Sequence, residues 1–326
     1  MTDARDPSVP LGTDRAVVAA SAPVAGAEPV LLPTAARSQW WDVWDQFRTH
    51  RGALAGATVF FAIVALVVLG PVLFDLDGQT TNVRERNQGM TLAHPFGTDQ
   101  LGRDIFARMV EGGRVSLAVG FTAMALSLVL GTLVGVLSGF FRALDGPLMR
   151  LTDLFLALPL LPLLLVMVLL FREPLTAAFG PEAGIFLLIV SAIGITSWMQ
   201  TARIVRGDVL ALKEREFVLA ARSLGTPPRR VITRHVLPNV LSPIMVSATL
   251  GIATAIITES ALSFLGLGFP PDFPTWGRLL NDGLQYMQQY PERVFWPGLA
   301  ISLVVLSINY VGDGLRDALD PRIRGR

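Results

Sequence analysis

Long uncharged stretches alternate with shorter polar segments along this chain of 326 residues. Six stretches contain no Asp, Glu, Lys or Arg and are between 18 and 27 residues long. A helix rises about 1.5 Å per residue, so roughly 20 residues cross the ~30 Å hydrocarbon core of a membrane. Backbone groups cannot remain unpaired in lipid, so each stretch is predicted to be a transmembrane helix. The six stretches are Gly52–Phe74, Val115–Phe141, Leu154–Phe171, Ala183–Ala202, Val236–Thr258 and Val294–Gly312.

The composition supports a membrane protein rather than a soluble domain. Hydrophobic residues make up 52% of the chain and charged residues only 16%, whereas a soluble domain carries roughly 25% charge. The fold predicted is an all-α integral membrane protein with about six transmembrane helices. In the third stretch, Pro159 and Pro162 predict a kink. At the start of that stretch, Arg150 and Asp153 are expected to form a local ion pair.

The basic residues are distributed unevenly between the two sides of these helices. If the N-terminus lies inside, the inner segments hold 19 of the 27 Lys and Arg residues, and most of the excess lies in residues 203–235. Cytoplasmic loops carry such an excess, which predicts that both termini are cytoplasmic. The 51 residues before the first stretch are polar and rich in Ala and Pro, which argues against a signal peptide.

The N-terminal region divides into two parts. Residues 1–38 contain scattered Pro, Ala and Val with no period, which predicts a disordered cytoplasmic tail. From Trp40 to His50 the pattern predicts a short amphipathic helix, with Arg48 and Arg51 at the lipid headgroups. Its apolar face consists of Trp40, Trp41, Trp44 and Phe47. An interfacial helix and ordinary aromatic anchoring explain this pattern equally well.

The segment 75–114 is predicted to contain a separate helix at the outer surface. One face of this helix is apolar and consists of Leu101, Ile105, Phe106, Met109 and Val110. Two acid-before-base pairs at i,i+4, Asp99 with Arg103 and Asp104 with Arg108, would each add roughly 0.2–0.5 kcal/mol. Bracing of the fold is the favoured role, and docking of an external partner is the alternative.

Small residues occupy every fourth position of the second stretch. They are Ala123, Ser127, Gly131, Gly135 and Gly139. Such a stripe lets two helices approach closely, either within the chain or against a second subunit. Before this stretch, Gly112 and Gly113 are expected to allow a turn out of the surface helix.

Several kinds of chemistry are not supported by the sequence. The chain has no cysteine, which excludes disulfides and thiolate metal sites. The three histidines, His50, His94 and His235, are far apart and do not predict a metal cluster. Lys213 is the only lysine and follows Ala-Leu, so the Gly-Lys-Ser/Thr of a phosphate-binding loop is missing. If the protein uses ATP, another subunit supplies the site.

The polar segment 203–238 predicts two short helices joined by a tight turn. Residues 217–224 favour a helix, and Gly225 stands where a helix C-cap belongs. The two prolines that follow prevent continuation, and a second short helix is expected from 228 to about 236. A solvated basic loop that only sets the topology is the alternative interpretation.

This segment resembles the EAA loop of ATP-binding-cassette (ABC) importer permeases. The resemblance lies in Ala220-Ala221, in Gly225 after three residues, and in the sequence His-Val-Leu-Pro at 235–238. In that family a short helix inserts into a groove of the ATPase subunit. Leu219 stands at the position of the name-giving Glu, so the packing role carries over but a salt bridge of that Glu does not. The resemblance assigns ATPase coupling to Arg215, Glu216, Ala220, Ala221, Arg222, Ser223, Leu224 and Gly225.

Further segments resemble the C-type permease of dipeptide, oligopeptide and nickel importers. They are 94–117, 262–283 and 312–324, and the resemblance runs from about Trp44 to Arg324. It implies type I ABC importer permease architecture in the bacterial inner membrane. The domains expected are the tail 1–38, a unit 39–114 with the first transmembrane helix, and a five-helix core 115–326 with the coupling loop 203–238.

The resemblance also implies a multi-subunit complex. A second, B-type permease would form the other half of the translocation pathway, two ATPase subunits would bind ATP and Mg, and an extracytoplasmic protein would deliver the substrate. Membrane lipid surrounds the chain, and no nucleic acid is expected. The chain itself would catalyse no bond chemistry and hold no cofactor or metal. Its two access states would alternate as ATP binding and hydrolysis move the coupling helices.

Glu259 is the most unusual charge in the sequence, since it follows 23 uncharged residues and precedes twelve more. If the fifth helix continues past it, Glu259 lies in the outer part of the membrane. An ionised group at mid-bilayer costs about 3 kcal/mol or more, so the side chain is expected to face protein or water. It is a candidate for the pathway or gate, where it would meet a cationic substrate. The alternatives are a headgroup-level position and a pair with the partner chain.

The substrate implied is a di- or oligopeptide, with nickel or another small solute as the alternative. A secondary transporter driven by an ion gradient is a rival of a different class. It predicts paired ionisable residues within the spans and inverted repeats, and the sequence offers only Glu259. A non-transporting membrane scaffold is the third possibility, and ATPase-linked uptake would exclude it.

Overall fold

The computed structural model describes residues 39–74 and 76–319, and these residues form helices without any β-strand. The all-α prediction is therefore confirmed over this part of the chain. The predicted tail 1–38 and the end of the segment 312–324 lie outside the described residues. The elements are α1 (Gln39–Thr49), α2 (Arg51–Phe74), η1 (Val83–Glu85), α3 (Ile105–Phe140), α4 (Arg142–Ala157), α5 (Leu160–Phe179), α6 (Pro181–Leu212), α7 (Glu216–Ser223), α8 (Pro228–Val231), η2 (Ile232–Val236), α9 (Leu237–Phe264), α10 (Trp276–Leu284) and α11 (Glu292–Leu319).

Within residues 39–74 and 76–319, six helical segments are long and apolar enough to cross a membrane, which confirms the number predicted. They are Arg51–Phe74, Ile105–Phe140, Leu160–Phe179, Pro181–Leu212, Pro228–Phe264 and Glu292–Leu319. Several of them continue beyond the uncharged stretches, because backbone hydrogen bonding does not end where charged side chains begin. The cytoplasmic position of the termini stays a prediction.

Helices α3 and α6 pack along each other at the centre of the described unit. The small residues of α3 face α6 in this contact. A Cβ atom on Gly135 would lie 2.7 Å from the Val205 side chain, and one on Gly139 would lie 2.7 Å from Val209. A Cβ atom on Gly131 would lie 2.7 Å from both the Trp198 carbonyl oxygen and the Thr201 side chain. The stripe therefore serves a contact within the chain, and Ser127 is also fully buried.

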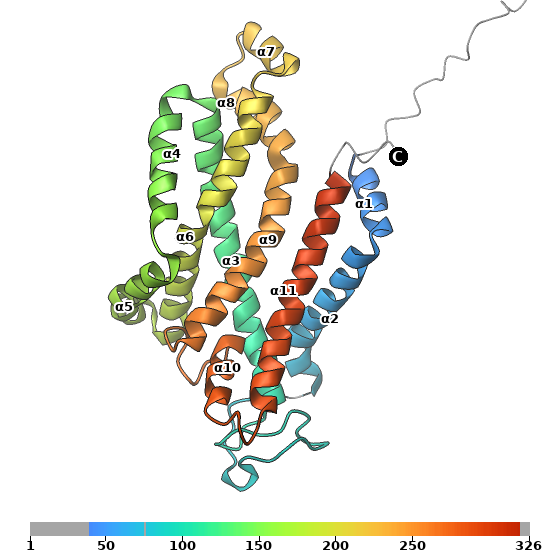
Figure 1. The fold of residues 1–326 in the computed structure, drawn as a ribbon, viewed down its shortest axis with the longest axis vertical. Coiled ribbons are helices and arrows are strands. Elements are labelled where there is room, and N and C mark those ends of the chain that lie inside the picture. Colours follow the sequence, from blue (N-terminus) through green and yellow to red (C-terminus); the bar gives the residue numbers. More distant parts are fainter. Residues whose placement is uncertain (1–38, 75, 320–326) are drawn as a thin grey trace, which may run out of the picture. The chain divides into compact units, whose positions relative to one another are not determined.

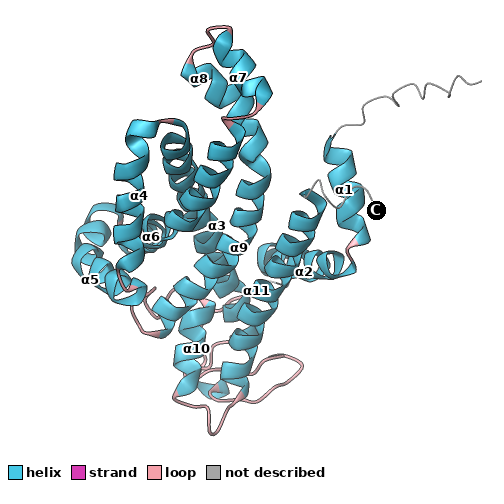
Figure 2. Ribbon diagram, turned by 45° about the horizontal axis from the view of Figure 1, so that its top comes forward, coloured by secondary structure: helices cyan, strands magenta, loops and turns pink. Residues whose placement is uncertain are grey.

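The remaining long helices pack around this pair. Helix α9 contacts both α3 and α11, and α2 packs on α11, while α4 and α5 lie next to α6 (Figures 1 and 2). Pro71 inside α2 leaves the Val67 carbonyl without its helical donor. Arg114 of α3 replaces that donor, since its Nε atom lies 2.9 Å from the Val67 oxygen. A polar side chain thus completes the backbone bonding of a neighbouring membrane helix.

The prediction of a separate outer-surface helix in 75–114 is wrong. Helix α3 begins at Ile105 and continues without a turn through Gly112 and Gly113. A Cβ on Gly113 would lie 2.8 Å from the ring of Trp276, and one on Gly112 would lie 3.2 Å from the backbone of Thr275. These glycines permit close packing and do not form a turn. The predicted domain boundary at 114/115 consequently falls inside α3.

The two predicted ion pairs near the start of α3 have different outcomes. Arg103 does bind Asp99, with Nε and Oδ2 2.7 Å apart, but within a turn and not on a helix. Asp104 caps α3, because its Oδ1 accepts from the backbone N–H groups of Phe106 and Ala107. Arg108 binds Asp99 instead of Asp104, with Nη1 and Oδ2 3.1 Å apart. A capping carboxylate is turned toward the backbone and away from the next helical turn.

The third predicted stretch does not form one kinked helix but is divided between two. Helix α4 ends at Ala157 and α5 begins at Leu160, with Leu158 and Pro159 between them in extended conformation. A proline disfavours helical geometry in the residue before it, which explains the break at Leu158. Pro162 lies in the first turn of α5, where its missing N–H has no helical partner to lose.

The predicted local pair between Arg150 and Asp153 is also not observed, since Asp153 of α4 binds Arg203 of α6, with Oδ1 and Nη2 2.5 Å apart. A second pair joins the same helices. Arg206 donates through Nε and Nη2 to the two carboxylate oxygens of Asp145, at 2.5 and 2.8 Å. Tertiary packing of α4 on α6 brings these partners together, although they are 50 and 61 positions apart in sequence.

Helix α1 is observed where the N-terminal amphipathic helix is predicted, and it packs on α11. Trp41 and Trp44 are exposed, and the ring of Trp44 stacks on Phe47 with centroids 6.1 Å apart. Arg48 is exposed near the end of the same helix. The exposed aromatic and basic side chains fit both an interfacial helix and ordinary aromatic anchoring.

Candidate functional site

The segment 203–238 contains the first predicted short helix, α7, and the tight turn after it, but the second predicted short helix is not separate, because α8 continues through η2 into α9 without a break. Helix α6 continues to Leu212, so the non-helical part is shorter than the polar segment. Gly225 follows α7 with φ +76° and donates its N–H to the Arg222 carbonyl at 2.9 Å. Thr226 donates to the Ala221 carbonyl at 3.2 Å. These two bonds form a Schellman motif, which ends α7 and directs the chain into α8. Figure 1 shows α7 and α8 beyond the ends of α6 and α9.

One face of α7 is anchored in an apolar cluster. Val218 is fully buried and Ala221 is nearly so. The guanidinium of Arg222 lies 4.7 Å from the ring centroid of Phe140 at the end of α3, a cation–π contact. Val218 belongs to a buried apolar cluster with Val136, Val205, Val209, Val231, Val236, Val240 and Ile244. The packing fixes α7 relative to α3, α6 and α9, so a force applied to α7 reaches three membrane helices.

The other face of α7 is exposed and largely apolar. Leu224 is 86% exposed, and Phe217 and Leu219 are each 44% exposed. Ala220 lies between them and is also exposed. Exposed apolar side chains of this size on a projecting helix are typical of a protein contact. The predicted coupling residues thus divide into buried Ala221 and a set of exposed residues, of which Arg222 also contacts Phe140. The exposed set is Arg215, Glu216, Ala220, Arg222, Ser223, Leu224 and Gly225.

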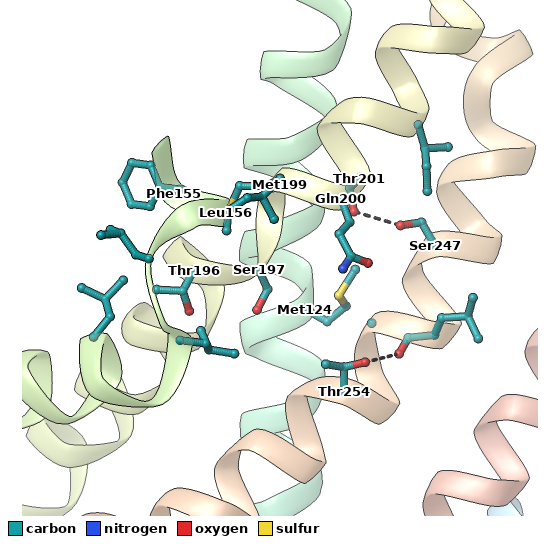
Figure 3. Close-up of a pocket in the computed structure, with 16 residues that line it drawn as sticks. Met124, Phe155, Leu156, Thr196, Ser197, Met199, Gln200, Thr201, Ser247 and Thr254 are labelled. Atoms are coloured by element: carbon teal, nitrogen blue, oxygen red, sulfur yellow. Dashed lines mark hydrogen bonds between the residues drawn. The ribbon is translucent and has the colours of Figure 1, made fainter. Parts of the chain in front are cut away.

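A pocket of about 280 Å³ opens between α3, α4, α5, α6 and α9. We name it the Gln200 pocket. Figure 3 shows Thr201 and Gln200 of α6 opposite Ser247 and Thr254 of α9, with Met124 of α3 near them. The sixteen residues that line it are Met124, Phe155, Leu156, Leu158, Leu160, Leu163, Thr196, Ser197, Met199, Gln200, Thr201, Ile204, Ser247, Leu250, Gly251 and Thr254. None of them carries a charge.

The Gln200 pocket is not among the sites predicted from the sequence. The sequence feature that could have indicated the pocket is a set of polar residues inside two uncharged stretches. Thr196 and Gln200 are four residues apart on one helix, and Ser247 and Thr254 are seven residues apart on another. Both spacings place side chains on one helical face. That α6 and α9 contact each other next to α3 could not be read from the spacing.

Most hydroxyl groups of the pocket are satisfied locally. The Thr201 and Ser247 hydroxyl oxygens lie 2.9 Å apart and join α6 to α9. Thr254 donates to the Leu250 carbonyl at 3.1 Å, and Thr196 donates to Ala192. The exposed amide of Gln200 has no hydrogen-bond partner among the described residues. The pocket therefore presents a free amide and several hydroxyl oxygens with spare acceptor capacity.

Glu259 lies outside this pocket and is fully buried. Helix α9 continues past Glu259 to Phe264, and the carboxylate faces protein, one of the two surroundings expected for it. Its Oε1 accepts from the Ser263 hydroxyl at 2.7 Å, and its Oε2 accepts from Ser116 of α3 at 3.0 Å. The Ser116 hydroxyl in turn accepts from the backbone N–H of Trp276 in α10 at 3.3 Å. The pathway role stays a prediction, while the observed bonds join three helices.

A network of ion pairs stabilises the α10 end of the unit. Arg108 binds Asp99 and also lies 3.9 Å from Asp282 of α10. Arg293 of α11 donates to the Thr98 carbonyl at 2.7 Å and stacks over the ring of Tyr290. Buried Asp99 forms ion pairs with both Arg103 and Arg108. Buried Arg293 is instead held by the Thr98 carbonyl, the Asn87 side chain and the aromatic ring, and its Nε and Nη1 atoms have no hydrogen-bond partner among the described residues. The loop between α2 and α3 is thereby attached to α10 and α11.

The described residues contain no group of three or more His, Cys, Asp or Glu side chains placed to hold a metal ion. His94 instead binds Asp104, with Nδ1 and Oδ2 2.8 Å apart, next to Glu85. This arrangement connects the loop to the N-terminus of α3. Nothing in the described part of the chain points to a cofactor.

The family model for the binding-protein-dependent transport system inner membrane component matches residues 127–325. The chain belongs to this family. A second model, for the N-terminal transmembrane domain of oligopeptide transport permease C, matches residues 38–93. As a member of the family, the chain is a multi-pass protein of the bacterial inner membrane and the non-catalytic membrane component of its transport system. Membership favours the importer over the ion-coupled transporter and the scaffold.

Individual relatives are similar along most of the chain. The dipeptide transport system permease protein DppC of Alkalihalophilus pseudofirmus is 39% identical over 88% of this chain and 91% of its own length. The oligopeptide transport system permease protein OppC of Bacillus subtilis is 40% identical over 88% of this chain and 91% of its own length. An inward-facing MetNI methionine ABC transporter matches 65% of this chain and 96% of its own, with a TM-score of 0.52 at 20% identity. That similarity shows that this chain has the fold of an ABC importer permease.

Proposed function

We propose that this chain is the C-type permease of an ABC importer for di- or oligopeptides. The observation that carries the proposal is the 39–40% identity, over 88% of the chain, to permease proteins of dipeptide and oligopeptide transport systems. A glutathione transport permease from Shigella boydii is 38% identical over 93% of the chain. The substrates in these names are short chains of amino acids joined by amide bonds, which makes the amide unit the common feature to recognise.

The subunit partners follow from the same proposal. A B-type permease completes the pathway, two ATPase subunits bind ATP and Mg, and an extracytoplasmic protein delivers the peptide. The dependence on a binding protein agrees with the family's description. The absence of a Gly-Lys-Ser/Thr motif in the sequence supports ATP binding on other subunits.

Helix α7 is the proposed contact with the ATPase. Its exposed residues Phe217, Leu219 and Leu224 provide an apolar surface, while Arg215 and Glu216 provide polar groups at its edge. Since the α7 end then faces the ATPase, both termini of the chain are cytoplasmic and the α10 end faces the binding protein. Separate family models for residues 38–93 and 127–325 support a division into an N-terminal unit and a core.

The proposal is tested by purifying the tagged chain from its native membrane in mild detergent and identifying what accompanies it by mass spectrometry. A second permease with one or two ATPases is expected. Uptake of a radiolabelled tripeptide by proteoliposomes of that complex, dependent on ATP and on the binding protein, is the functional measurement. Recovery of the chain alone, under conditions that preserve known complexes, would contradict the proposal.

A further inference from the structure

The mouth of the Gln200 pocket carries an unpaired polar group. Gln200 lies three residues before Arg203 on α6, or about 4.5 Å along the helix axis, near the end of the uncharged stretch Ala183–Ala202 that is closer to α7. Its amide is exposed and has no hydrogen-bond partner among the described residues. An unpaired amide in hydrocarbon costs several kcal/mol. The mouth of the pocket therefore faces water or another polar group.

The polar groups of the pocket fit a peptide bond better than a side chain of either charge. A peptide unit has one N–H donor and one carbonyl acceptor. The Gln200 amide offers both a donor and an acceptor, and the hydroxyl groups of Ser247 and Thr254 offer further acceptor sites. The lining contains no charge that would attract or repel an ionised side chain. Met124 and Met199 supply flexible apolar surface that adapts to different side chains.

We propose that the Gln200 pocket is a contact site for the backbone of a peptide in transit, and that its lack of charge makes passage indifferent to the charge of the peptide's side chains. This inference rests on the proposed importer function. The volume of about 280 Å³ is near the lower end of the ~300–1,000 Å³ range of ligand pockets. It suits a short segment of a peptide rather than a whole oligopeptide.

The test introduces a charge at the mouth of the pocket. The complete importer carrying Gln200→Glu is compared with wild type in proteoliposomes, with uptake of Ala-Ala-Ala, Ala-Lys-Ala and Ala-Glu-Ala measured at saturating binding protein. For each peptide the ratio of variant to wild-type uptake is taken, which removes the binding protein's own preference. Gln46→Glu in α1 is the control, because α1 contributes no residue to the pocket.

Gln200→Glu is expected to lower the ratio for Ala-Glu-Ala by about fivefold relative to Ala-Ala-Ala, the effect of two like charges about 4 Å apart in water. Gln200→Lys is expected to reverse the preference and lower the ratio for Ala-Lys-Ala. Binding-protein-stimulated ATP hydrolysis is expected to remain, which shows that both variants assemble. Gln46→Glu should leave all three ratios equal.

Two results would overturn the inference while the proposed function stands. Equal ratios for the three peptides in both Gln200 variants would mean that the pocket does not meet the substrate. Loss of the second permease from both variant complexes would assign the pocket to a subunit interface. A third result would overturn both this inference and the proposed function as a peptide importer. In that result the wild-type complex takes up none of the three peptides but hydrolyses ATP in response to another ligand of its binding protein.

Discussion

At the scale of single residues, burial changes what a charged side chain can do. The sequence identifies Glu259 as a charge inside an apolar region, and the structure surrounds it with hydroxyl groups from Ser116 and Ser263. Serine hydroxyls are short, so they satisfy a carboxylate only when the helix backbones are close. The same residue thus becomes a structural link between α3 and α9, whether or not it also meets a substrate.

The link predicts a large effect of removing the carboxylate. Glu259→Ala leaves the Ser116 and Ser263 hydroxyls without their acceptor and creates a cavity in a fully buried site. Together, the two effects are expected to lower the free energy of unfolding by about 2–5 kcal/mol. The thermal unfolding temperature of the detergent-purified chain is expected to fall clearly, whereas Glu214→Ala at an exposed position should leave it unchanged. An unchanged unfolding temperature for Glu259→Ala would show that these bonds contribute nothing to stability.

The pathway role of Glu259 needs a separate variant. Glu259→Gln keeps the size of the side chain and an acceptor oxygen but removes the charge. If the carboxylate meets a cationic substrate, uptake of Ala-Lys-Ala should fall relative to Ala-Ala-Ala while the complex stays assembled. Equal effects on the two peptides would count against a pathway role and leave the structural role in place.

At the scale of elements, the break between α7 and α8 decides how the exposed face is presented. Gly225 adopts φ +76°, and a Cβ atom at this position would meet no atom within 4 Å. A substitution there acts through backbone conformation and through the surface it presents, not through a clash. Asn and Asp tolerate this conformation better than other residues with a side chain, which allows charge and conformation to be separated.

Gly225→Asp is expected to uncouple ATP hydrolysis from uptake while the chain still inserts into the membrane. The reason is that an ionised side chain at a protein contact must lose its hydration. Gly225→Asn has nearly the same shape without the charge and should keep most of the uptake. Tripeptide uptake and binding-protein-stimulated ATPase activity are measured in parallel. Normal uptake by Gly225→Asp would argue that α7 does not contact the ATPase.

The contact between α4 and α6 gives a prediction that depends on pH. Two hydrogen bonds from Arg206 hold the pKa of Asp145 below its usual value. The pair is partly exposed, so its contribution is modest, about 0.5–1 kcal/mol after solvent screening. A lowered folded-state pKa means that this contribution is complete above the unfolded pKa of about 3.9 and is lost as the pH falls through the lower, folded value.

Asp145→Asn is therefore expected to lower the unfolding temperature slightly at pH 7 and to converge with wild type as the pH falls below about 4. Asp272→Asn, at an exposed position, is the control and should show no difference at either pH. Thermal unfolding of the purified chains across this pH range is the measurement. A difference for Asp145→Asn that persists at low pH would assign the effect to something other than the ion pair.

At the scale of the whole described unit, close backbone contact between α3 and α6 organises the other helices around them. Gly135 illustrates this, because a Cβ there would lie 2.7 Å from both the Ala202 carbonyl and the Val205 side chain. Gly146 of α4 is the opposite case, with no atom within 4 Å of an added Cβ. The same substitution should therefore have opposite consequences at two helical glycines.

Gly135→Ala is expected to destabilise the chain by about 1–3 kcal/mol through overpacking. Gly146→Ala is expected to stabilise it by up to about 1 kcal/mol, since alanine favours a helix more than glycine does. The two unfolding temperatures, measured in the same detergent, should move in opposite directions. Equal shifts would mean that α3 and α6 do not pack as closely as the structure describes.

The amino-acid sequence by itself determined the number of membrane helices, the turn at Gly225 and the segment that forms α7. These features depend on local causes: the apolar length needed to cross a membrane, the conformational freedom of glycine and the missing N–H of proline. The local sequence led to a wrong prediction at Gly112 and Gly113, where a turn was expected but both residues lie within α3. Glycine permits both a turn and a close contact, and only the neighbours decide between them.

The tertiary structure alone decided which side chains meet. Asp153 binds Arg203 instead of nearby Arg150, and the polar residues of α6 and α9 converge to form the Gln200 pocket. Such contacts join positions that are far apart in sequence, 50 positions for Asp153 and Arg203 and 46 positions for Thr201 and Ser247. Side-chain spacing along one helix defines a face, but the rotation and crossing of packed helices define what that face contacts. For this reason the spans could be predicted from sequence and the pocket could not.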